Sequence, residues 1–113
     1  MELTCHCGNI RLTASKVPAE LASCNCSICR RYAALWAYYP PSEVQVESLE
    51  QPPVSYIWGD KEVAFEHCGV CGCITHYRTL PNCDSEILAI NMRLAENELV
   101  QSLPRRAIDG ASY

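Results

Sequence analysis

Cysteine is the residue type that stands out in this chain, with nine in 113 residues. Seven of the nine form tight clusters with one or two residues between neighbouring thiols. Thiols at these spacings bind a metal ion, pair as disulfides or carry redox chemistry. Because the count is odd and no basic-plus-apolar leader of the secretory type precedes the clusters, we interpret them as metal ligands of a cytoplasmic protein.

Two clusters share a pattern, a close cysteine pair followed by glycine. They are Cys5-His6-Cys7-Gly8 and Cys68-Gly69-Val70-Cys71-Gly72. A glycine after the second cysteine tolerates the positive φ that a metal-binding turn often needs. Two such half-sites together supply four thiolates to one tetrahedral zinc ion. We therefore predict a closed structural zinc site whose ligands are Cys5, Cys7, Cys68 and Cys71. The alternative is that these residues are reduced thiols of the core.

The remaining cluster places three cysteines within six residues, in Cys24-Asn25-Cys26-Ser27-Ile28-Cys29. Three protein ligands with a fourth position left open are typical of catalytic zinc, and the open position takes water, substrate or an added thiolate. Arg30 and Arg31 follow at once and can attract an anionic ligand. The predicted catalytic residues are Cys24, Cys26, Cys29 and Arg30, and the three cysteines are also predicted ligands of a second zinc.

Alternatives to an open zinc site remain at the sequence level. A hidden fourth ligand, from Cys73, His67 or His76, would make this site structural as well. An iron–sulfur cluster also suits cysteine ligation. His76 itself is either a ligand or proton shuttle, or a hydrogen-bonded packing residue. Five aromatic residues either pack in the core or line a pocket: Trp36, Tyr38, Tyr39, Trp58 and Phe65.

The elements that must position these clusters are mostly strands. Alternating and β-branched or aromatic stretches predict strands near Ile10–Ala14, Leu35–Tyr39, Val44–Val46, Val54–Trp58, Val63–Glu66, Ile74–Tyr77 and Ile87–Asn91. Gly59-Asp60 predicts a hairpin between two of them. Helix is expected only as short turns at Ser27–Tyr32 and Ala95–Val100. The predicted class is mainly β with little helix, in one domain over residues 1–113.

Composition narrows the possible partners. Hydrophobic content of 49% with 19% charged residues is ordinary for a globular protein, and no apolar run is long enough to span a membrane. The formal net charge is −4 with neutral cysteines. Seven thiolates holding two zinc ions would change it to about −7. We therefore expect neither nucleic-acid nor membrane binding.

The order of the motifs resembles one family. CxCG at residue 5, CxCSxCR at residue 24, HCxxCG at residue 67 and the segment Asn91-Met92-Arg93-Leu94 are similar to the glutathione-dependent formaldehyde-activating (GFA) family, whose domain centromere protein V shares. The resemblance extends to the closing Asp109-Gly110-Ala111-Ser112. It implies a zinc-stabilised, tent-like arrangement of antiparallel sheets. It also implies a structural zinc on the four cysteines named above and a catalytic zinc on the three.

The resemblance further implies a carbon–sulfur lyase that reversibly adds glutathione to formaldehyde to form S-hydroxymethylglutathione. Arg30 would then hold a carboxylate of the tripeptide. The chain departs from the family pattern at two positions, with Asn25 where relatives commonly carry histidine and Ala33 where many carry glycine.

We expect a zinc-dependent lyase-like enzyme acting on an aldehyde–thiol adduct, with glutathione as the candidate thiol. The alternatives are a non-catalytic zinc-binding interaction domain and a redox or metal-buffering protein.

Overall fold

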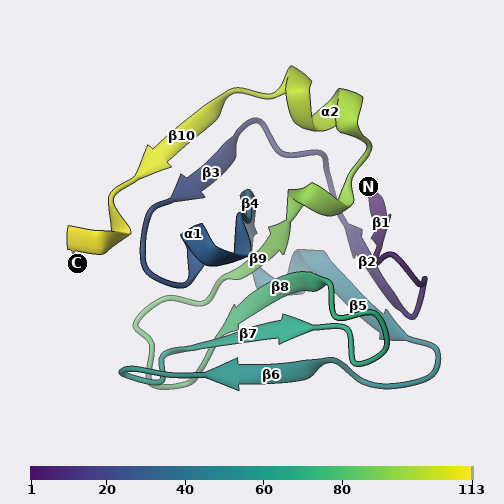
Figure 1. Ribbon diagram of the computed structural model, residues 1–113, viewed down its shortest axis with the longest axis horizontal. Coiled ribbons are helices and arrows are strands. Elements are labelled where there is room, and N and C mark those ends of the chain that lie inside the picture. The colour runs from purple at the N-terminus through teal and green to yellow at the C-terminus, as the bar shows by residue number, and fades with distance from the viewer. Residues whose placement is uncertain (113) are drawn as a thin grey trace.

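The computed structural model describes residues 1–112, which form ten strands in two sheets with short helical turns between them (Figure 1). The strands are β1 (Glu2–Thr4), β2 (Ile10–Ala14), β3 (Leu21–Cys24), β4 (Trp36–Tyr39), β5 (Val44–Ser48), β6 (Val54–Ile57), β7 (Val63–His67), β8 (Ile74–Thr79), β9 (Leu88–Asn91) and β10 (Arg105–Ile108). The helices are α1 (Cys29–Tyr32) and α2 (Asn97–Ser102), with 3-10 turns η1 (Pro41–Glu43), η2 (Met92–Leu94) and η3 (Gly110–Ser112). The mainly β class is confirmed.

The larger sheet has seven strands in the order β10-β3-β4-β9-β8-β7-β6, and the smaller has three in the order β1-β2-β5. All pairings are antiparallel except one, because β10 runs parallel to β3. A parallel pair needs a crossover connection, and here the chain passes through η2 and α2 before it returns beside β3 (Figure 1). The larger sheet is therefore mixed, with this one parallel pair among the antiparallel pairs that the family resemblance implied.

Side-chain patterns explain which strands are central. In β2 the residues Ile10, Leu12 and Ala14 are buried and alternate with more exposed ones, as expected for a strand with one covered face. All four residues of β9 are buried, which is the pattern of a central strand covered on both faces. All four residues of β6 are exposed, and β6 is the edge strand of the larger sheet.

Buried side chains form two clusters, and each contains part of one cysteine group. The first packs the smaller sheet on the larger one and includes Cys5 and Cys68. The second surrounds Trp36 and Phe65 and includes Cys29. Both cysteine groups are thus anchored in packed interior. Across residues 1–112, no helix has the length and apolar character needed to cross a membrane.

Candidate functional site

The first cysteine group joins two turns that are far apart in sequence. Cys5 and Cys7 come from the β1–β2 turn, and Cys68 and Cys71 come from the β7–β8 turn, both on the right in Figure 1. The four sulfur atoms lie within 4.8 Å of one another. The glycine after each pair has positive φ, +84° at Gly8 and +80° at Gly72, so the predicted use of these glycines is confirmed.

The sulfur spacing in this group matches a tetrahedral metal site. The Cys7 Sγ lies 3.7 Å from the Sγ of Cys5 and 3.7 Å from that of Cys68. A zinc–sulfur bond of about 2.3 Å in a tetrahedron gives a sulfur–sulfur distance of about 3.8 Å. The donor set and its spacing therefore fit a zinc ion.

N–H groups point at the same sulfurs, as thiolate ligands require. The Cys68 Sγ accepts hydrogen bonds from the Val70 N–H at 3.3 Å, the Cys71 N–H at 3.5 Å and the Asn9 side-chain amide at 3.5 Å. The Cys5 Sγ accepts from the Ile10 N–H at 3.3 Å. Such hydrogen bonds stabilise thiolates and orient metal ligands.

The pKa values of two thiols reflect these donors. Burial raises the pKa of Cys68, but the Cys71 N–H, the Asn9 amide and the Val70 N–H outweigh it and bring the pKa down to about 7. Burial also raises the pKa of Cys71, and the N–H groups of Cys73 and Cys7 outweigh it, giving about 6. Both thiols are therefore prepared for deprotonation near neutral pH.

The second cysteine group is local and lies on the left of the centre in Figure 1, where β3 leads into α1. Cys24 ends β3, Cys26 lies in the connecting loop and Cys29 begins α1. Their three sulfur atoms lie within 4.8 Å of one another. The first turn of the helix holds this loop in place, with the Arg30 N–H donating to the Cys26 carbonyl at 3.1 Å.

Cys29 is the buried member of this group. The indole Nε1–H of Trp36 donates to the Cys29 Sγ at 3.3 Å, and the Cys29 N–H donates to the Cys26 Sγ at 3.5 Å. Burial raises the pKa of Cys29, and the Trp36 donor partly offsets that effect. A cation near these sulfurs is the simplest way to make all three thiolates at neutral pH, which fits a metal site.

Within residues 1–112, no further cysteine, histidine or carboxylate joins the group of three. Of the suggested fourth ligands, Cys73 lies beside Cys71 of the first group, and His67 ends β7 at the edge pairing with β6. His76 is buried on β8 with its Nδ1 2.9 Å from the Thr75 Oγ1. Burial lowers the pKa of His76 to about 4, so it is a neutral packing residue.

The C-terminal turn closes over this three-cysteine group. The Asn25 side chain donates to the Asp109 Oδ1 at 2.9 Å and accepts from the Ala111 N–H at 2.9 Å. Gly110 lies so close that an added Cβ would be 2.5 Å from the Cys24 Sγ. Asn25 therefore holds a covering turn in which only glycine fits beside the sulfur.

A cationic hollow opens beside the same group. It has a volume of about 290 Å³ and is lined by Cys24 and Cys29 together with three arginines, Arg30, Arg93 and Arg105. Arg93 Nε donates to the Ala33 carbonyl at 3.0 Å. None of the three arginines takes part in the salt bridges found among residues 1–112. This hollow has the charge to receive an anion next to the sulfurs.

The predicted residue Arg30 is thus placed at the group, whereas Arg31 turns away. Arg31 donates to the Ser27 carbonyl at 2.7 Å and borders a separate hollow with Tyr56 and Trp58.

The aromatic residues divide between core and surface. Trp36, Tyr39 and Phe65 are buried, while Tyr38 and Trp58 are partly exposed. Trp36 packs edge-on against Tyr77 with ring centroids 4.8 Å apart. The rings of Trp36, Phe65 and Tyr77 form the apolar wall behind Cys29.

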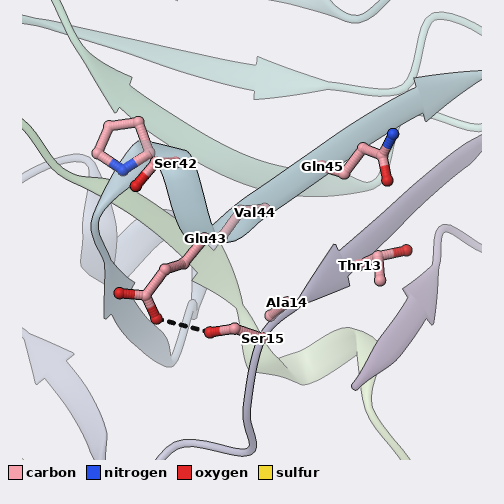
Figure 2. Close-up of a pocket in the computed structure, with 8 residues that line it drawn as sticks. Thr13, Ala14, Ser15, Ser42, Glu43, Val44 and Gln45 are labelled. Carbon is pink, nitrogen blue, oxygen red and sulfur yellow. Dashed lines mark hydrogen bonds between the residues drawn. The ribbon is translucent and has the colours of Figure 1, made fainter.

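A larger hollow, of about 500 Å³, lies elsewhere and is lined by none of the cysteines. Figure 2 shows it between β2 and η1–β5, where the Ser15 hydroxyl donates to Glu43 at 2.6 Å. Choosing a candidate site by cavity size would therefore miss both cysteine groups.

Sequence reasoning missed four contributors to the two groups: Asn9, Arg93, Arg105 and Gly110. Asn9 directly follows the first glycine-flanked pair, and Gly110 follows an aspartate near the chain end, so position offered a weak signal for each. Arg93 and Arg105 are brought in only by the chain path through η2 and β10.

Comparison with known proteins agrees with this arrangement. The family described as glutathione-dependent formaldehyde-activating enzyme matches residues 1–106. No curated protein matches the chain in sequence. A crystal structure of a Rhodobacter sphaeroides protein superposes with a TM-score of 0.76 at 25% sequence identity, covering 94% of this chain and 100% of that one. With the family match spanning nearly the whole chain and both cysteine groups assembled, the protein belongs to the glutathione-dependent formaldehyde-activating enzyme family.

Proposed function

We propose that the protein is a zinc-dependent carbon–sulfur lyase-like enzyme that makes and breaks aldehyde–thiol adducts such as S-hydroxymethylglutathione. The observation that carries the proposal is the three-cysteine group with a cationic hollow beside it. Cys24, Cys26 and Cys29 would hold one zinc, and Cys5, Cys7, Cys68 and Cys71 would hold a structural one. Zinc at the three-cysteine group would favour the thiolate form of a bound thiol and polarise a carbonyl.

The residues of the chain supply binding and orientation. Arg30, Arg93 and Arg105 face the hollow and can hold the carboxylates of an anionic thiol. The covering turn at Gly110 limits access of solvent to Cys24. In the synthetic direction the thiol sulfur bonds to the aldehyde carbon and the thiol proton passes to the carbonyl oxygen. In the reverse direction the carbon–sulfur bond breaks and the hydroxyl proton returns to sulfur.

The alternative is a non-catalytic zinc-binding interaction domain. It requires a closed second site with a fourth ligand from the protein. The candidates His67, Cys73 and His76 do not join the group of three, which favours the enzyme. The cytoplasmic location expected from reduced thiols agrees with nine free cysteines, and it stays a prediction.

Magnetisation-exchange NMR on S-hydroxymethylglutathione in equilibrium with glutathione and formaldehyde tests the proposal, because it reads exchange above the fast uncatalysed rate. The zinc-loaded protein should add a concentration-dependent exchange rate. Cys26→Ser should abolish it and Cys83→Ser should keep it, since Cys83 lies outside both groups. An exchange rate equal to the buffer rate, or one that survives Cys26→Ser, would sink the proposal.

A further inference from the structure

A second hollow borders the three-cysteine group on a different side. It has a volume of about 280 Å³, and its lining is Cys26, Ile28, Trp58, Gly59, Asp60, Val63 and Phe65. The lining comes from the loop before α1, the β6–β7 turn and β7. Since Cys26 forms part of its wall, a molecule bound at the sulfurs can extend directly into it.

The lining is apolar apart from one carboxylate. Phe65 is 7% exposed, and Val63 and Ile28 are half-buried. Trp58 is 43% exposed and stands at the opening. Asp60 is exposed, and its Oδ1 accepts the Glu62 N–H at 3.3 Å. The hollow therefore suits an apolar group and disfavours an anionic one.

A hydroxymethyl adduct leaves this hollow unused. The aldehyde carbon of formaldehyde carries only hydrogen atoms, so its adduct places nothing apolar beyond the reacting carbon. A volume of about 280 Å³ is small for a whole drug-sized ligand but ample for an alkyl or phenyl group.

The two hollows beside the sulfurs have opposite chemistry. The cationic one is reached from Cys24 and Cys29, and the apolar one from Cys26. Because the three sulfurs lie within 4.8 Å, one molecule bound there can extend into both. Its anionic thiol part would lie against the arginines and its aldehyde-derived part against Trp58 and Phe65.

We infer that the substrate adduct carries an apolar alkyl or aryl group on its aldehyde carbon, seated against Ile28, Trp58 and Phe65. The protein thus acts on adducts of an anionic thiol with an apolar aldehyde larger than formaldehyde. This inference rests on the proposed function and names its substrate class. Asp60 at the rim discriminates against aldehydes that bear a carboxylate.

Isothermal titration of the zinc-loaded protein with S-methyl-, S-butyl- and S-hexylglutathione tests the inference without turnover, because these thioethers have no hydroxyl to release. Each added methylene should tighten binding by about two- to fourfold until the hollow is filled. S-butylglutathione, with three more methylenes, should therefore bind about 8- to 64-fold tighter than S-methylglutathione. An S-alkyl chain of the same length ending in a carboxylate should lose most of that gain.

Trp58→Ala should reduce the ratio of S-butyl to S-methyl affinity to near one. Tyr56→Ala is the matched control, since Tyr56 is 47% exposed on β6, close to Trp58 in sequence, and does not border this hollow. That variant should keep the wild-type ratio. Trp58 is largely at the surface, so its replacement leaves the core intact.

The outcomes separate the inference from the proposed function. Affinity that does not change with chain length, a ratio that survives Trp58→Ala, or no thioether binding at all overturns the inference. If chain-length dependence is found together with exchange at the buffer rate, the inference on ligand class stands and the proposed reaction fails.

Discussion

At the scale of single residues, the two cysteine groups differ in which hydrogen-bond donors surround their sulfur atoms. The sulfurs of the first group are surrounded by N–H donors from their own turns and from Asn9. In the second group, Cys29 relies on the indole of Trp36, which comes from a neighbouring strand. A metal at the second site would therefore be held with less help from the local backbone.

Trp36→Phe tests that reading, because it keeps an aromatic ring in the core but removes the N–H that reaches Cys29. Loss of such a supporting hydrogen bond typically costs about 10- to 100-fold in metal affinity. We expect one zinc to weaken by that factor while the other is unchanged, measured by competition with a chromophoric chelator. Trp58→Phe serves as control, and equal weakening of both zincs would contradict the assignment.

His76 predicts a specific pH dependence of stability. Burial holds its pKa at about 4 against an ordinary value of 6.5, with Glu66 and Arg78 as the charged groups facing it. Between these values the unfolded chain takes up a proton that the folded chain excludes, so stability falls as pH falls from about 6.5 to about 4. The shift corresponds to about 2 kcal/mol lost between pH 7 and pH 5.

Urea unfolding of wild type and His76→Gln at pH 7 and pH 5 measures this effect. Zinc loss at low pH acts on both proteins, so the difference between them isolates the histidine. The variant should lose about 2 kcal/mol less than wild type on acidification. Exposed His6→Gln should behave as wild type, and identical pH slopes for all three proteins would show that His76 is not the cause.

At the scale of elements, α1 ends in a strained conformation. Ala33, its C-terminal cap, has φ of 53° and ψ of 33°, the left-handed region that glycine adopts at low cost. The cap lies directly after the three-cysteine loop, so strain there is located where α1 supports the second group.

Ala33→Gly should therefore stabilise the protein by about 1 kcal/mol, since an L-residue with a Cβ costs about 1–2 kcal/mol in this conformation. Thermal unfolding of zinc-loaded proteins measures it. Ala107→Gly in β10 is the control, because it replaces an exposed strand alanine without positive φ and should destabilise by about 0.5–1 kcal/mol. A loss of stability in Ala33→Gly would refute the strain.

Strands with a clear hydrophobic pattern could be predicted from the sequence, and strands without one could not. All seven strands expected from alternation or β-branched runs are present, including β4, β7 and β9. Three strands were not anticipated: β1, β3 and β10. The first is three residues long, and β3 and β10 carry small or charged residues whose pairing depends on partners distant in the chain.

Within the candidate site, too, some residues could be predicted from the sequence and others could not. The cysteine groups could be predicted because their ligands lie at short, fixed spacings, and the structure brings together the thiols that were expected to meet. The bordering residues Arg93 and Arg105 reach the site through η2 and through the pairing of β10 with β3, two strands that are far apart in the chain. No local spacing encodes those contacts.

At the scale of the whole molecule, each cysteine group is built into a different part of the core. The first links the β1–β2 turn of the small sheet to the β7–β8 turn of the large one, so it ties the two sheets together. The second lies where β3 leads into α1, and it borders two hollows. This difference in placement supports the proposed stabilising role of the first group and the proposed reactive role of the second.

Cys68→Ser tests the stabilising role. A structural zinc contributes on the order of 10 kcal/mol to folding, which is comparable to the whole stability of a typical domain of about 5–15 kcal/mol. We expect the variant to be largely unfolded by circular dichroism and one-dimensional NMR. Cys83→Ser is the control because that thiol lies outside both groups. A Cys68→Ser protein as stable as wild type would disprove the structural site.

The most direct measurement of the account is the zinc content per chain, before and after a mild chelator, followed by titration of the labile fraction with glutathione. We predict two zinc ions per chain, one resistant to the chelator and one readily removed. Glutathione should perturb the labile ion because its fourth position is open to a thiolate. Two equally resistant zinc ions that do not respond to thiols would contradict it.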